Sequence, residues 1–526
     1  MRIAPSLIDP EAEKIVRRLR RFGHTAFLVG GCVRDLLLGR TPKDFDVATS
    51  ATPAELVSLF RNCRIIGRRF RLAHIFFGSK YIETSTFRTN PREGAPTDEM
   101  EELLIRRDNV FGTAEEDARR RDFTINGLFY DLERGDVVDY VGGLVDLDAR
   151  VIRTIGEPGI RFREDPVRIL RAIKFAARLG FEIDSATYAA IIANRNEISK
   201  CAPPRVLEET YRLLRGAAAS RSIDLLLRTG VAAVLSPHLA FLYGGPDAVK
   251  PTTPADAHPE TAHAHGTQTT EQQAPHRRTI DDRHLFGCRL DSLEAEGRGR
   301  EQALQLLRRL DALTGSPAAV AAAQHILGSL ESDRPRRRYR NSPPEPFPSN
   351  ALLLALVIAP FIQPETTTGE RRRRSSPSTA VIDEVLGKLA TGIRASRRDT
   401  ERARLILTIQ LRMSIDQRRD RQPQLQASDA LGESLLLHGM LTTVTEAAKR
   451  EDSPTDGRLK PTDSASDVDR TEELTRLLED AAGTARKAKG RHRRGGRNRR
   501  RHSQTEPTDW LRDSPVSDSG SHGSVA

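Results

Sequence analysis

The sequence is poor in cysteine and aromatic residues and has no long hydrophobic run. Its four cysteines form no Cys-x-x-Cys pair, so the sequence predicts neither a zinc knuckle nor a disulfide framework. Aromatic residues make up 5% and hydrophobic residues 38% of the 526 positions, which predicts that part of the chain does not fold. No segment approaches about eighteen uninterrupted apolar residues, and the N-terminus lacks the apolar run of a signal peptide. We therefore expect a cytoplasmic protein without a membrane segment.

Positive charge is present in excess, but it is concentrated near the C-terminus. The chain carries a net charge of +11, and residues 486–502 hold ten lysines and arginines and no acid. Such a segment attracts phosphates by counterion release, which gives salt-sensitive binding without sequence preference. RNA is the expected partner, with Arg491, Arg493 and Arg494 among the binding residues. The alternative is a solvated tail that aids solubility.

Breaks in composition divide the chain into five blocks. Residues 1–155 alternate strand-like and helical patterns, and residues 156–243 turn helical, with apolar residues three and four positions apart. Residues 244–290 are polar and are expected to be a disordered insertion; helical patterns resume over 291–449, and a disordered basic tail covers 450–526. The predicted fold is α+β: a head with a mixed sheet and helices, followed by an all-helical neck and body.

The stretch "FLVGGCVRDLLLGRTPKDFDVATS", residues 27–50, carries the strongest chemical signal. An apolar strand ends in Gly30 and Gly31, whose missing side chains allow a triphosphate to approach the backbone at the start of a helix. Asp44 and Asp46 follow in an alternating segment, so both carboxylates project from one side of a strand.

Two adjacent carboxylates repel each other, which costs stability unless a cation compensates. Two magnesium ions about 3.5–4 Å apart would relieve this repulsion, activate an attacking hydroxyl and stabilise a leaving pyrophosphate. The alternative is an acidic strand end in which Asp44 pairs with Lys43 or Arg40. We favour the metal hypothesis because the glycine pair precedes the two acids.

Glycine pair, spacer and Asp-x-Asp resemble the signature of the nucleotidyltransferase superfamily, and more narrowly of its class II branch, which contains bacterial poly(A) polymerase and CCA-adding tRNA nucleotidyltransferases. The resemblance implies that Asp44 and Asp46 ligate Mg²⁺, with Mn²⁺ as an alternative, and that Gly30, Gly31 and Arg34 bind the nucleotide.

Further motifs extend the resemblance along the chain. "RRDFTIN" resembles the branch's Arg-Arg-Asp element, which implies that Arg120 and Arg121 bind the nucleotide and that Asp122 is the third catalytic carboxylate. Without the other motifs, the same residues would be interpreted as a surface ion-pair cluster. The segment after residue 139 resembles the connector that acts as a hinge between head and neck.

"REDPVRILRA" resembles an element that reads the nucleotide base, here through Asp165 and Arg168. Because Asp165 precedes a proline, it is also a good helix N-cap, and the two roles are compatible. "RVLEETYRLL" resembles an element in which Arg205 and Glu209 stabilise the base-binding helix. Glu83, in the alternating "YIETST", is a further candidate for the metal site, and a cross-strand ion pair explains it equally well.

"GRRFRLAH" within residues 65–77 resembles the signature that separates poly(A) polymerases from CCA-adding enzymes. Arg68, Arg69 and Arg71 are expected to hold RNA or triphosphate, and the alternative is a solvated basic loop.

The resemblance implies a template-independent enzyme that adds AMP from ATP to RNA 3′ ends in mRNA processing and decay, working as a monomer. RNA-decay proteins are expected partners of the tail. The alternatives are CCA addition to tRNA and a non-catalytic RNA-binding scaffold.

Overall fold

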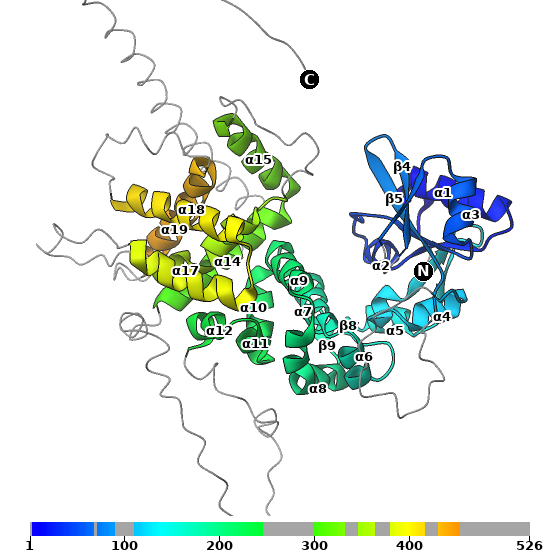
Figure 1. Cartoon of the computed structure of the whole chain (residues 1–526), viewed down its shortest axis with the longest axis horizontal. Helices are drawn as coiled ribbons and strands as arrows, with labels where there is room; N and C mark the ends of the chain where they lie inside the picture. Colours follow the sequence, from blue (N-terminus) through cyan, green and yellow to red (C-terminus); the bar gives the residue numbers. More distant parts are fainter. Residues whose placement is uncertain are drawn as a thin grey trace, which may run out of the picture.

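The computed structural model describes residues 3–67, 71–89, 110–245, 298–331, 346–362, 379–415 and 430–451. Within these ranges, no helix is both long and apolar enough to span a bilayer. The fold is α+β, as predicted, with a sheet-containing head followed only by helices and one small ladder. Figure 1 shows a crescent in which the head lies at one end, the helical body at the other, and the neck joins them below.

A seven-stranded mixed sheet forms the centre of the head, with strand order β3-β4-β5-β2-β1-β6-β7. The strands are β1 Ala26–Val29, β2 Asp46–Thr49, β3 Cys63–Ile66, β4 Leu72–Phe77, β5 Lys80–Thr86, β6 Leu128–Asp131 and β7 Asp136–Asp139. β2 and β5 run parallel, whereas the other neighbours are antiparallel. The parallel pairing aligns Asp46 with Glu83.

Helices cover the two faces of this sheet unequally. The head contains η1 Pro5–Leu7, α1 Pro10–Arg21, α2 Gly31–Leu37, α3 Pro53–Leu59, α4 Ala114–Arg119, η3 Thr124–Asn126 and α5 Gly143–Asp148. Ile15 of α1 and Leu56 of α3 join Ile75 and Ile82 of the sheet in the large core. On the opposite face, Ala118 of α4 packs with Phe129 in a smaller cluster. The β3-β4-β5 portion of that second face carries polar and aromatic residues instead.

The neck is helical and packs directly on the head. Its elements are β8 Val151–Ile152, α6 Pro158–Glu164, α7 Val167–Leu179, β9 Glu182–Ile183, α8 Ser185–Asn194, η4 Arg195–Lys200, α9 Pro203–Arg215, α10 Ala219–Arg228, α11 Val231–Leu235 and α12 Pro237–Gly244. α7 begins after Pro166 and ends at Gly180, which adopts the left-handed conformation (φ 76°) that glycine accepts most easily. Phe175 of α7 meets Phe123 of the head edge to face, with 5.8 Å between ring centroids.

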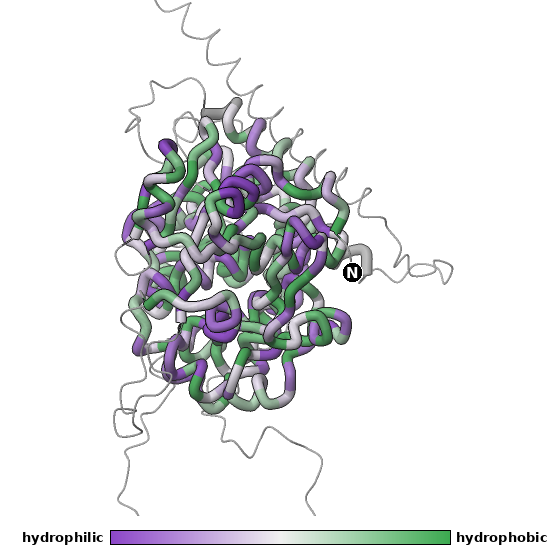
Figure 2. The backbone as a smooth tube through the Cα atoms, turned by 90° about the vertical axis from the view of Figure 1, so that its right-hand side faces the viewer, coloured by the Kyte–Doolittle hydropathy of each residue, from purple (hydrophilic) through white to green (hydrophobic). Residues whose placement is uncertain are grey.

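The described part of the body is a helical bundle. Its helices are α14 Arg298–Gly315, α15 Pro317–Glu331, α16 Asn350–Ile358, η8 Ala359–Ile362, α17 Thr379–Ile393, α18 Arg397–Ile415 and α19 Leu431–Glu451. α16 is buried on every side, which explains why its sequence is apolar throughout. Most other elements alternate apolar and polar stretches, as Figure 2 shows, because each has a buried and an exposed face.

Candidate active site

A cleft of about 850 Å³ opens between the sheet and the neck helices. Head residues between Val29 and Asn126 and helices α7 and α9 of the neck contribute to its walls. Its charged lining consists of Arg34, Arg88, Arg120, Arg121, Arg168, Arg171, Arg205, Arg212, Asp46, Glu83, Asp122, Asp165, Glu208 and Glu209. A space of this size accommodates a nucleotide, and a wall rich in arginine suits phosphate.

The acids of the cleft come from two adjacent strands. Asp46 is the first residue of β2, and its partner in register on β5 is Glu83. Burial and the neighbouring carboxylates of Glu83 and Asp44 raise the pKa of Asp46 to about 6, although Arg121 opposes the shift. Burial also raises the pKa of Glu83, and Asp44 adds to this shift. Asp44 itself lies exposed just before β2. Three carboxylates therefore repel one another at the edge of the cleft.

The glycine pair shapes the cleft beside these acids. Gly30 has φ 75°, and a Cβ there would lie 3.0 Å from Nη1 of Arg121, so the position suits glycine alone. Its N–H donates to the Leu128 carbonyl across the sheet, so it is not free to bind phosphate as expected. Gly31 opens α2 and lines the cleft. The role of Gly30 is therefore conformational.

Arg34 is buried, with 3% of its surface exposed, and donates to Asp35 and to Oδ1 of Asn126. Its guanidinium also lies 5.3 Å from the Phe175 ring centroid. Arg34 thus links α2 to Asn126 and Phe175, which line the cleft.

One buried acid orients the two predicted nucleotide-binding arginines. Asp117 of α4, 1% exposed, accepts from Arg120 Nε at 3.0 Å through Oδ1 and from Arg121 Nη2 at 2.9 Å through Oδ2. Arg121 also lies 5.1 Å from the Phe129 ring centroid. The arginine pair is therefore held by the protein interior and is not a solvated surface cluster. Asp117 was not predicted; the sequence signal was its i, i+3 and i, i+4 spacing to the arginines.

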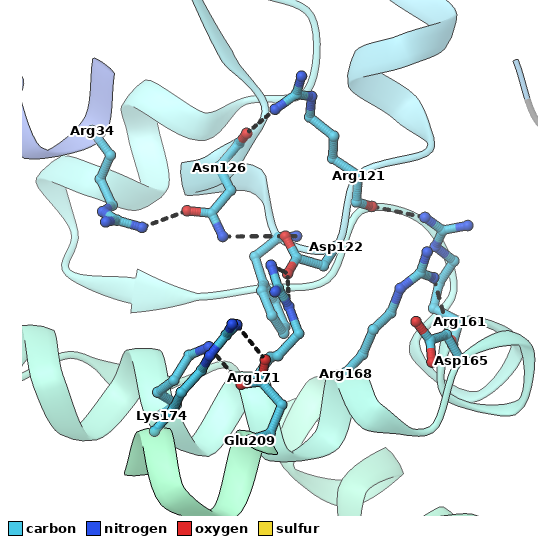
Figure 3. Close-up of polar contacts among 12 residues, drawn as sticks. Arg34, Arg121, Asp122, Asn126, Arg161, Asp165, Arg168, Arg171, Lys174 and Glu209 are labelled. Atoms are coloured by element: carbon cyan, nitrogen blue, oxygen red, sulfur yellow. Dashed lines mark hydrogen bonds and ion pairs between the residues drawn. The ribbon is translucent and has the colours of Figure 1, made fainter. Parts of the chain in front are cut away.

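Asp122 occupies a different environment from the one predicted. Its Oδ2 accepts from Arg171 Nε at 2.7 Å, and its Oδ1 accepts from Asn126 Nδ2 and from the Phe123 N–H (Figure 3). Burial alone would raise the pKa of Asp122, but Arg171 and Asn126 hold it at about 2. Both oxygens of Asp122 are thus bound by the protein, and its expected role as the third catalytic carboxylate stays a prediction. Glu83, the other candidate, lies beside Asp46.

Asp165 turns toward the neck and does not cap α7. Pro166 occupies the N-cap position of α7, and no side chain makes a capping hydrogen bond there. The alternative that Asp165 caps this helix is therefore wrong. Oδ2 of Asp165 accepts from Arg205 Nη2 at 2.9 Å, while Oδ1 is buried without a hydrogen-bond partner among the described residues. Arg168 contacts the Arg120 carbonyl and Glu164. Asp165 thus lines the cleft and keeps one carboxylate oxygen buried without a partner among the described residues.

The neck supplies a further buried pair behind these residues. Lys174 of α7 donates to Glu209 of α9 at 2.6 Å, as Figure 3 shows. Burial and the nearby Arg171 lower the pKa of Lys174 to about 8 despite Glu209. The predicted stabilising role of Glu209 agrees with this contact. Arg171 and Lys174 were missed, although their spacing places them on the same helix face as Arg168.

The remaining predicted RNA-binding residues are placed only in part. Arg71 is exposed at the start of β4. Arg68 and Arg69 lie outside the described residues, as do Arg491, Arg493 and Arg494. Gly244, the first residue of the predicted 244–290 insertion, ends α12, and residues 246–290 also lie outside the described ranges.

The donor set beside Asp46 suits a hard divalent cation. Carboxylate oxygens are the ligands that Mg²⁺ prefers, and a cation there would relieve the repulsion that raises the pKa of Asp46. Over the described ranges, no three histidine, cysteine or acidic side chains are gathered tightly enough to form a complete site. Substrate phosphates and water would supply the remaining ligands.

A mixed sheet that presents acids from adjacent strands to an arginine-rich cleft, closed by neck helices, defines the nucleotidyltransferase class. Residues 26–153 match the family model for the poly A polymerase head domain, and residues 180–242 match the model described as the probable RNA and SrmB-binding site of polymerase A. Over these two ranges the chain is therefore similar to the nucleotidyltransferases that include poly(A) polymerase I and the CCA-adding enzymes.

Two curated relatives show how far the similarity extends. The chain is 49% identical over 224 residues to poly(A) polymerase I of Escherichia coli O6:H1, covering 42% of this chain and 48% of the relative. It is 38% identical over 225 residues to the CCA-adding enzyme of Geobacillus thermodenitrificans, covering 43% and 54%. The chain thus spans about half the length of these relatives. The solved CCA-adding enzyme of Bacillus stearothermophilus with CTP aligns with 90% of this chain and 83% of its own at 22% identity and a TM-score of 0.49.

Proposed function

We propose that this protein is a polynucleotide adenylyltransferase, which transfers AMP from ATP to the 3′-hydroxyl of RNA without a template. In this reaction the 3′-oxygen bonds to the α-phosphorus, the bond to the β-phosphate breaks, pyrophosphate leaves and the hydroxyl proton passes to solvent. The observation that carries the proposal is the carboxylate cluster of Asp46, Glu83 and Asp44 at the edge of the arginine-lined cleft.

The acids would hold Mg²⁺, or Mn²⁺ in its place. When bound, the ion supplies charge neutralisation at the reacting phosphate and lowers the pKa of the attacking hydroxyl. Asp46 and Glu83 are the ligands we assign, with Asp44 completing the set. The bound ion would remove the free-energy cost of the repulsion among these three carboxylates.

Arginines that line the same cleft would bind the triphosphate. Asp117 binds one part of each guanidinium group of Arg120 and Arg121. The other part faces the cleft, which both residues line. Planar guanidinium groups donate in pairs to phosphate oxygens. Because Asp117 fixes them from behind, little side-chain entropy is lost when the nucleotide binds.

Asp165 is the residue that we assign to the amino group of the nucleotide base. Its Oδ1 is buried without a partner among the described residues, and a rotation of the side chain toward the cleft would let this oxygen accept a hydrogen bond from the N6 amino group. An unsatisfied buried acceptor costs about 1–3 kcal/mol, so a base that supplies the missing donor is favoured. The 4-amino group of cytosine is also a donor, so Asp165 alone does not separate ATP from CTP.

An assay with the purified chain tests the proposal. RNA primer is incubated with each nucleotide and Mg²⁺ or Mn²⁺, and AMP addition with pyrophosphate release is expected. Asp46→Asn and Glu83→Gln should each lower kcat by about 10²-fold or more, since each removes charge stabilisation at the reacting phosphate. Glu133→Gln, with a side chain 61% exposed on the head, is the control. Full activity in both active-site variants would overturn the proposal.

CCA addition to tRNA is the second candidate, favoured by the 38% identity to the Geobacillus enzyme. Efficient cytidine addition to a tRNA lacking its terminal CCA would support it against adenylate transfer. A role in mRNA processing and decay, cytoplasmic location, a monomeric state and decay-protein partners remain predictions.

A further inference from the structure

A row of aromatic side chains lies on the sheet face next to the carboxylate cluster. β3, β4 and β5 pair so that Arg64 lies opposite His74, His74 opposite Glu83, and Phe76 opposite Tyr81. Side chains two residues apart on a strand share a face, so these residues project from the same side as Asp46. We call Arg64, His74, Phe76 and Tyr81 the aromatic strip.

The opposite face of the same strands is occupied by the core. Ile75 and Ile82 are buried against α1 and α3, and Lys80 pairs with Asp9 and Glu11 at the start of α1. The aromatic strip therefore lies on the side that these helices leave uncovered. Tyr81 is 49% exposed, and Arg64 is exposed as well.

The rings of the strip are already arranged as a stack. Tyr81 lies 4.2 Å from His74 with only 7° between ring planes, and Phe76 lies 5.8 Å from Tyr81 at 51°. The Arg64 guanidinium carbon lies 5.4 Å from the Phe76 centroid. Because Tyr81 covers His74 and is itself half exposed, it offers surface on which another flat ring can continue the stack.

This strip is continuous with the candidate active site. His74 Nε2 lies 3.7 Å from Oε2 of Glu83, and Glu83 and Leu72 line the cleft. Arg71, exposed beside Leu72, adds positive charge at the same end.

We propose that the aromatic strip is a stacking platform for single-stranded RNA, on which a base upstream of the reacting 3′-hydroxyl packs against Tyr81. The inference rests on the proposed function, since it requires a 3′ end at the acids beside Glu83. Aromatic rings interleaved with arginine on an exposed sheet are the surface that unpaired bases recognise without sequence preference. A purely structural role would account for cross-strand packing, but it leaves a half-exposed tyrosine ring beside the cleft without a function.

Binding of single-stranded oligo(A), measured by anisotropy without nucleotide, tests the platform directly. Tyr81→Leu should weaken binding about 5- to 20-fold, toward the lower end of what one base–aromatic stack contributes. Tyr81→Phe and Tyr81→Trp should retain binding. Phe22→Leu is the matched control, because Phe22 is 54% exposed and also lies under an arginine, Arg18, but belongs to the far side of the head.

Kinetics distinguish stacking from support of Glu83. We expect Tyr81→Leu to raise the KM for RNA by the same factor and to leave kcat and the KM for ATP within about twofold. A fall in kcat or a rise in the KM for ATP would show that Tyr81 only positions the acid. If Tyr81→Leu left the affinity for oligo(A) unchanged, the stacking platform would also be overturned, and the aromatic strip would instead be a binding surface for a protein.

A tryptophan reporter gives a spectroscopic measure of the same contact. In a Trp510→Phe background, which removes the natural tryptophan, the ring placed by Tyr81→Trp should lose emission when oligo(A) stacks on it. No quenching at saturating oligo(A) would contradict the platform. If the wild-type chain adds no nucleotide but the binding and quenching results hold, the proposed function fails and the platform stands; the reverse pattern removes the platform alone.

Discussion

Replacing Asp46 by asparagine is expected to stabilise the metal-free protein. The pKa of Asp46 rises from 3.8 to about 6 because the folded state buries it beside Glu83 and Asp44. Below about pH 4 the carboxyl is protonated in both states and has no effect. Between pH 4 and 6 the folded state holds the proton that the unfolded state releases, so stability falls as the pH rises. Above pH 6 the full penalty remains.

The structure sets the size of this effect. A shift of about two pKa units corresponds to about 3 kcal/mol, which is an upper limit. Asp46 is only partly exposed, but Asp44 is exposed, so solvent and salt screen part of the repulsion between them. We therefore expect Asp46→Asn to raise the free energy of unfolding by about 1–2 kcal/mol. That gain would raise Tm by about 2–8 °C for a unit the size of the head and neck.

Calorimetry of Asp46→Asn and wild type in EDTA, at pH 8 and at pH 4, checks the prediction. The variant should melt higher at pH 8 and equally at pH 4. Saturating Mg²⁺ should remove the advantage, because a bound ligand stabilises wild type by about 2.7 kcal/mol at one hundred times its Kd. A variant that melts at or below the wild-type temperature in EDTA at pH 8 would refute the reasoning.

Asp131→Asn is the matched control on the same sheet. Burial opposes ionisation of Asp131, yet its contact with Arg20 at 2.8 Å lowers its pKa overall. Its stabilisation is present above the unfolded pKa and is lost as the pH falls. The control should therefore destabilise at pH 8 and have little effect in acid, opposite in sign to Asp46→Asn.

Three further changes test other parts of the molecule. Asp117→Asn should raise the KM for ATP about tenfold with a smaller change in kcat, because it loosens Arg121; Glu115→Gln, at a side chain that pairs with the exposed Arg119, is the control for steady-state assays. Arg171→Met should lower the free energy of unfolding by about 3–5 kcal/mol by leaving Asp122 buried without its cation, and adding Asp122→Asn should restore part of the loss in denaturant melts. Deleting residues 486–502 should weaken RNA binding and flatten its salt dependence without removing activity on a short primer; equal affinity at low salt would show an idle tail.

The sequence predicted those site features that depend on local patterns. The glycine pair, the following helix and the strand at Asp46 all lie within 27–50, where spacing alone determines which side chains face together. The α+β architecture followed from the change of period near residue 156 for the same reason.

Features that depend on distant partners were predicted poorly. The motif at Asp122 resembled the third catalytic carboxylate but gave no sign of Arg171, 49 residues later, which binds Asp122 in the fold. Asp165 satisfied the local rule for an N-cap, but Arg205, 40 residues later, binds it instead. The alignment of Glu83 with Asp46 requires a parallel pairing across two intervening strands, which no local pattern specifies.

These long-range contacts also change the interpretation of the connector between head and neck. A hinge was expected there, yet the neck binds the 120–122 turn directly: Arg161 Nη2 donates to the carbonyls of Arg120 and Arg121 at 2.6 and 2.7 Å, and Arg171 pairs with Asp122. Because backbone carbonyls and a buried carboxylate are the acceptors, separating head from neck would leave buried polar groups unpaired. The neck therefore fixes the turn that carries Arg120 and Arg121, and a motion that releases the neck would also disorganise the triphosphate site that we propose there.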